Sequence, residues 1–111
     1  MAVAETQTSR AAAAGGWHCA GTKVSRCIER TGANKMRVNF VNKTSTKVTA
    51  EFGVTCQGSS GQRAYTLKKN LKARGGYLSQ PITCPGGLQD TAHGWQITPS
   101  GNVYRTPAIA I

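Results

Sequence analysis

The residues suited to acid–base catalysis are few, since the 111-residue chain holds two histidines and four acidic side chains. Asp90 and His93, three positions apart, would pair an orienting carboxylate with a general base. His18 with Glu29 or Glu51 would complete the acid–base groups of a basic secreted nuclease. Each histidine stands beside a cysteine or a glycine, as loop histidines often do. We therefore predict a protein that is not an enzyme, and a histidine bonded to a carboxylate in a cleft would contradict this.

The four cysteines favour disulfides over a metal site. Cys19, Cys27, Cys56 and Cys84 lack the close paired spacing of a zinc site. A short, Gly-rich chain with an even number of cysteines is typical of a secreted protein, and we expect no metal or cofactor. Three pairings are possible, and we expect neighbours to pair, Cys19 with Cys27 and Cys56 with Cys84. Each bridge would then stabilise the fold by roughly 2.5 to 3.5 kcal/mol.

A run of basic residues is the first candidate binding site. Four cations fall within seven residues and are bracketed by Tyr65 and Tyr77: Lys68, Lys69, Lys72 and Arg74. The cations would meet phosphates or acidic groups while the tyrosines stack on bases. The formal charge of +10 favours acidic partners such as nucleic acid, anionic polymers or acidic proteins. The alternative is a solvated face beside a turn.

The first 16 residues form the second candidate site. They contain no aromatic residue and too few apolar side chains to order themselves, which predicts an N-terminal arm, 1–16, ahead of a domain, 17–111. Such an arm can enter a groove of a partner. The candidate contact residues are Glu5, Thr6, Ser9, Arg10, Ala11 and Ala12. The alternative is a linker left after processing.

Strict apolar alternation identifies the elements that must position these groups. It runs from Thr46 to Cys56, with Cys56 on the apolar face, and again from Met36 to Val41. A two-residue period is that of half-buried strands. Because Asn42 to Ser45 has the composition of a turn, we predict that the two strands pair as a central antiparallel hairpin.

The remaining segments also indicate short strands and turns, and no stretch is long and apolar enough to span a bilayer. A Pro-Ser-Gly turn at 99–101 predicts a further hairpin. Val24 and Ile28 are expected to point inward. The expected strands are 23–30, 63–71, a return strand 78–84 after a turn at 74–77, 95–98 and 102–105, before an apolar tail 107–111. Six to eight strands favour an all-β fold, a small disulfide-bonded antiparallel sandwich or barrel.

A small secreted β-domain with two disulfides and a leading arm resembles the adaptor subunits of the umbrella toxin particles of Streptomyces. Those adaptors link a lectin subunit, which has a degenerate trypsin-like fold, to the spokes of a large repeat toxin. The resemblance is one of architecture over the whole chain. It implies that roughly Glu5 to Gly16, with Arg10, inserts into a cleft of the lectin subunit.

These features lead us to expect a secreted, non-enzymatic adaptor that bridges other protein subunits. The alternatives are a proteinase inhibitor presenting Arg10 or the loop from Lys23 to Arg26, a polyanion-binding domain, and a virion decoration subunit. Asn42-Lys43-Thr44 is formally a glycosylation sequon.

Overall fold

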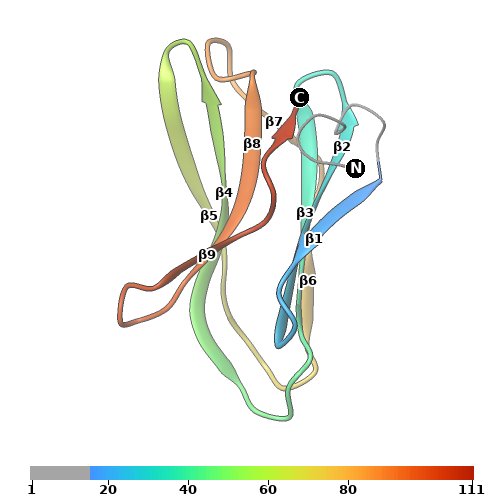
Figure 1. The fold of residues 1–111 in the computed structure, drawn as a ribbon, viewed down its shortest axis with the longest axis vertical. Coiled ribbons are helices and arrows are strands. Elements are labelled where there is room, and N and C mark those ends of the chain that lie inside the picture. Colours follow the sequence, from blue (N-terminus) through green and yellow to red (C-terminus); the bar gives the residue numbers. More distant parts are fainter. Residues whose placement is uncertain (1–15) are drawn as a thin grey trace.

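The computed structural model describes residues 16–111, which form ten strands and no helix. They make two antiparallel sheets that lie face to face (Figure 1). The first sheet contains β1 (Trp17–Ala20), β2 (Val24–Gly32), β3 (Lys35–Asn42), β6 (Gly76–Leu78) and β7 (Ile82–Thr83). The second contains β4 (Val48–Gly58), β5 (Gly61–Leu71), β8 (Thr91–Ile97), β9 (Val103–Arg105) and β10 (Ile109–Ala110). The predicted all-β sandwich is therefore confirmed.

The core lies between the sheets and is filled by the alternating side chains of their central strands. Val38 and Phe40 of β3 and Phe52 and Val54 of β4 are all 0% exposed. The rings of Phe40 and Phe52 meet across the core with their centroids 5.1 Å apart. Val24 and Ile28 of β2 also face inward, as expected. Burial of one sheet face from each strand explains the two-residue period of the sequence.

The predicted central hairpin is wrong. β3 pairs with β2, β6 and β7 in the first sheet, whereas β4 pairs with β5 and β8 in the second. Residues 43–47 cross from one sheet to the other, so that β3 and β4 pack face to face instead of edge to edge. Two strands with one apolar face each can hide those faces by this stacking, which a flat hairpin cannot do.

The return strand predicted at 78–84 also has a different partner. The chain turns at Ser59-Ser60 and returns as β5, which pairs with β4. β6 and β7 instead join the edge of β3 in the opposite sheet. The two short strands flank a break that contains Pro81. Proline has no N–H to give to a ladder, so an interruption at an edge is its expected effect.

The final hairpin and the apolar tail are confirmed, and one strand was not expected. β8 and β9 pair around the turn at 99–101, and Ile109 in β10 is only 1% exposed. Ile109 is thus covered by its own domain, and Ile111 is half-buried against the core. β1 was missed because its four residues are too few to show a period.

Both disulfides form as expected. Cys56 on β4 bonds to Cys84, which directly follows β7, and so ties the second sheet to the first. Cys19 and Cys27 bond between neighbouring strands of the first sheet, where they face each other in register. Two disulfides are consistent with an extracellular protein. Within residues 16–111 there is no helix that is long and apolar enough to cross a membrane.

Candidate functional site

The predicted catalytic pairs do not come together. Glu29 accepts a hydrogen bond from Arg37 Nε at 2.8 Å, and a Glu51 oxygen lies 4.0 Å from Lys69 Nζ. Neither histidine donates to or accepts from a carboxylate in the part of the chain that the structure describes. The same residues contain no group of three or more His, Cys, Asp or Glu side chains that could hold a metal.

His93 instead lines a shallow pocket of about 360 Å³ on the outer face of the second sheet. Burial lowers the pKa of His93, which is 8% exposed, and the positive charge of Arg105 lowers it further. The floor of the pocket depends on Gly53, where a Cβ atom would clash with the Trp95 ring and the Tyr65 carbonyl oxygen. Its lining mixes apolar, polar and charged side chains, Glu51 among them, and burial favours the neutral form of His93.

The predicted basic cluster divides into two groups. Lys68 and Lys69 lie exposed on β5, whereas Lys72 and Arg74 lie in the loop that leads to β6. The Arg74 backbone N–H donates to Thr44 O at 3.1 Å, and its guanidinium donates to Lys43 O. These bonds bring two loops together that are 30 residues apart in the chain.

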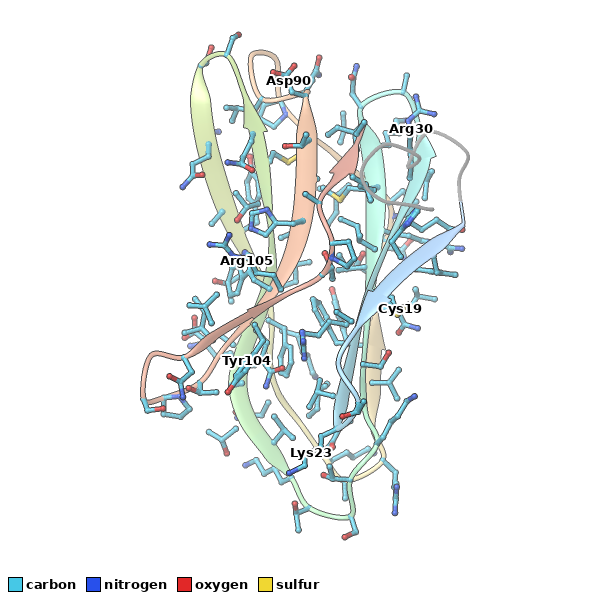
Figure 2. All side chains as sticks on the ribbon, in the orientation of Figure 1. Cys19, Lys23, Arg30, Asp90, Tyr104 and Arg105 are labelled. Carbon is cyan, nitrogen blue, oxygen red and sulfur yellow. A yellow bond between two sulfur atoms is a disulfide. The ribbon has the colours of Figure 1, made fainter. Side chains whose placement is uncertain are left out.

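Further lysines join this second group. The Lys43 N–H donates to Lys23 O at 2.9 Å, which places the turn between β1 and β2 beside the loop between β3 and β4. Lys23 lies at the lower end of the molecule (Figure 2), below the labelled Cys19, Tyr104 and Arg105. We call five exposed cations of these loops the basic end: Lys23, Lys43, Lys47, Lys72 and Arg74. Asp90 lies at the opposite end of the sandwich.

Asn42 holds the basic end in shape. It is 0% exposed, and its Nδ2 donates to Thr46 O at 2.8 Å and to Lys72 O at 3.1 Å. Its Oδ1 accepts from Thr44 N at 3.0 Å and from Thr44 Oγ1 at 2.7 Å. One buried amide therefore connects two of the three loops that carry the cations. Because that amide is buried and fully bonded, the sequon cannot accept a glycan in the folded protein.

The predicted aromatic platform does not form. Tyr65 and Tyr77 both pack against the hydrophobic core, because their positions on β5 and β6 lie opposite Val54 and Phe40. Rings held in this way do not stand between the cations for bases to stack on. Tyr104, which sequence reasoning did not single out, is 44% exposed and lies at the pocket described below.

The other predicted contact residues lie in the arm and in the loop from Lys23 to Arg26. The arm residues Glu5, Thr6, Ser9, Arg10, Ala11 and Ala12 lie outside the described residues. Of the two cations in the loop proposed to enter a protease cleft, only one lies in a turn. Lys23 is exposed at the turn, but Arg26 is inside β2 and donates from Nη1 to Val24 O at 3.0 Å.

A second, larger pocket of about 470 Å³ opens between the two sheets beside the basic end. Lys23 and Arg26 line it from the first sheet, and Gln96 and Tyr104 line it from the second. A sequence signal for it existed, since Arg26 interrupts the inward series of Val24 and Ile28 with a cation. Its partners were not foreseeable, because they come from about 70 residues further along the chain.

Comparison of the chain with known protein families, curated proteins and solved structures yields no match.

Proposed function

We propose that the protein is a secreted, non-enzymatic adaptor that bridges two other protein subunits, one bound by the N-terminal arm and one by the basic end. The observation that carries the proposal is that Trp17, where the arm joins the domain, and the basic end lie at different places along one sandwich. A bridge requires two surfaces that partners can occupy at once without touching each other.

The separation follows from the strand register. The arm joins the domain at Trp17, which lies opposite Glu29 on β2, whereas Val24 of the same strand lies opposite Asn42 at the basic end. Five residues at about 3.3 Å each place these points about 16 Å apart along the strand. Figure 1 shows β1 running between them, from the end of the grey trace towards the lower loops.

The two regions also differ in chemistry. Trp17 is 38% exposed on the outer face of the first sheet, and Arg37 lies 5.1 Å from its ring centroid. Leu78, 53% exposed, points to the same face. Exposed tryptophan and arginine side chains are typical of a protein-binding surface. The basic end offers only cations and backbone, which favours an acidic partner and rapid, electrostatically steered association.

The test is purification of partners from the culture medium of the native producer with tagged variants. The full chain should recover two proteins in stoichiometric amounts. A variant lacking residues 1–15 should lose one, and Lys43→Gln/Lys72→Gln/Arg74→Gln should lose the other. Loss of both proteins, or of neither, in these variants would contradict the bridge.

The charge control uses the cations of β5. Arg63→Gln/Lys68→Gln/Lys69→Gln removes the same charge from exposed positions outside the basic end, and it should keep both partners. If this variant loses a partner as readily as the basic-end variant, net charge rather than the basic end determines binding. Thermal unfolding of all variants checks that each is folded.

A second candidate function is binding of an anionic polymer such as nucleic acid. It is favoured by the basic end itself, whose cations make no ion pair with a carboxylate within residues 16–111. Binding of this kind weakens steeply with salt, with a logarithmic slope of about −0.7 to −0.9 per phosphate contact. Recovery of nucleic acid in place of proteins, with a logarithmic slope that is smaller in magnitude by about 2 to 2.7 in the triple variant, would favour this function over the bridge.

A further inference from the structure

The pocket between the sheets contains a cation that no carboxylate neutralises. Arg26 occupies an inward position of β2, half-buried, and its guanidinium lies 5.4 Å from the centroid of the Tyr104 ring. It donates to two backbone carbonyls, Val24 O at 3.0 Å and Arg105 O at 3.3 Å. The residues that line the pocket include no Asp or Glu. A partly desolvated guanidinium that meets only neutral acceptors favours an added anion.

Burial has a measurable effect on this group. It lowers the pKa of Arg26 from its ordinary value, and Tyr104 partly opposes that shift. The cost of placing the cation here is thus not offset by an acidic neighbour. Gly21 preserves the arrangement, because a Cβ atom at that position would clash with the Arg26 guanidinium and the Val24 carbonyl oxygen.

A second polar group in the same pocket lacks a partner. Gln96 is 6% exposed on the inward side of β8, and its Oε1 makes no hydrogen bond to any described residue. A buried acceptor without a donor costs about 1–3 kcal/mol. Because Gln96 lines the pocket, rotation of its side chain towards the opening would let a ligand hydroxyl satisfy this atom. The oxygen and nitrogen of the Gln96 amide can be exchanged in the assignment. The ligand group that pairs with it must therefore be able both to donate and to accept a hydrogen bond, as a hydroxyl does.

The other residues that line the pocket suit a molecule that carries both an anionic group and hydroxyl groups. Four threonines line the pocket, and Lys23 adds a second cation. The hydroxyls of Thr44 and Thr98 already bond within their own loops, whereas those of Thr22 and Thr46 have no partner among the described residues. Tyr104 supplies an exposed ring, on which the C–H face of a sugar can lie. The volume of about 470 Å³ is within the usual range of small-molecule sites, about 300–1,000 Å³.

We propose that this pocket binds an acidic sugar residue, with its carboxylate on Arg26 and Lys23 and its hydroxyls on Gln96, Thr22 and Thr46. The pocket thereby adds a small-molecule site to the protein, beyond its proposed bridging of subunits. The site shares Lys23 with the basic end, but the bridge does not require Arg26, Gln96 or Tyr104, so variants of these three residues allow either proposal to fail alone.

The experiment is a titration of the full ¹⁵N-labelled chain followed by NMR at constant ionic strength. The ligands are sodium glucuronate, glucose as the neutral control, and sodium phosphate as an anion that carries no sugar hydroxyl groups. Glucuronate should shift the amide signals of Thr22, Thr98 and Tyr104 saturably. Glucose and phosphate should each bind at least about 10-fold more weakly, since each lacks one of the two chemistries.

Two variants test the assignment. Arg26→Gln should weaken glucuronate binding at least about 10-fold, whereas Arg63→Gln, with the same charge loss on β5, should leave it unchanged. Gln96→Met should weaken binding while leaving the melting temperature equal or higher, because it removes the unpartnered polar atom. A merely structural role for Gln96 would lower the melting temperature instead.

Several results would overturn the proposal. These are no saturable shift at the pocket, equal binding of glucose and glucuronate, or phosphate binding as tight as glucuronate at the same amides. Unchanged glucuronate binding in folded Arg26→Gln protein, judged from its dispersed spectrum, would do so as well.

Discussion

Replacement of Asn42 by alanine tests whether one buried amide organises the basic end. The side chain makes four hydrogen bonds of 3.1 Å or shorter, two donated and two accepted. Each contributes about 1 kcal/mol net, and the carbonyls of Thr46 and Lys72, two exposed residues, lose a donor that water replaces only in part. Allowing for partial rehydration, Asn42→Ala should lower the free energy of unfolding by about 3 kcal/mol, which corresponds to roughly 12–24 °C in melting temperature.

The assay is urea unfolding followed by tryptophan fluorescence, with thermal unfolding as a second measure. Asn102→Ala is the matched control. Asn102 is exposed in the turn before β9, and the one contact of its amide nitrogen, to Ser100 Oγ, is 3.5 Å long. It should change stability by less than about 0.5 kcal/mol. A loss below about 1 kcal/mol for Asn42→Ala would refute the reasoning, because the loops would then hold their shape without the amide.

Three further predictions concern the disulfide between the sheets, the buried histidine and the close contact at Gly53. Cys56→Ala/Cys84→Ala opens a loop of 28 residues and should cost about 3.6 kcal/mol by loop entropy; a loss below about 1.5 kcal/mol in urea unfolding would contradict it. Because burial lowers the pKa of His93, the unfolded chain binds the proton more readily, so stability should fall as pH drops below about 6.5. His93→Gln should flatten this part of a melting-temperature profile, and an unchanged slope would count against it. Gly53→Ala sets a methyl group against the Trp95 ring and should destabilise by about 1–3 kcal/mol or more, whereas wild-type stability in the same assay would show that the ring can move aside.

Local pattern predicted the direction of side chains better than the partners of strands. The alternation through Val48, Phe52 and Cys56 correctly assigned the buried face, since a two-residue period reports burial directly. The same alternation fits a strand in a hairpin and a strand stacked across a core. The partner of β4 therefore could not be derived from it, and the hairpin with β3 was expected in error.

The candidate sites were predictable to different degrees. Lys72 and Arg74 were recognised because they are close in sequence, whereas Lys23 and Lys43 join them only through backbone hydrogen bonds between loops. The pocket was beyond reach for a similar reason. Its cation and its unpartnered amide are 70 residues apart, and no local rule relates them.

By itself, the sequence of this protein determined composition-level and local properties: the all-β class, the inward-facing residues and the net positive charge. These depend on interactions between residues that are close in the chain, or on sums over it. Only the tertiary structure decided that residues 43–47 cross between the sheets, that five cations gather at one end, and that Arg26 and Gln96 share a pocket. The physical reason is that strand pairing is chosen by the burial of all apolar faces together, and no single strand carries that information.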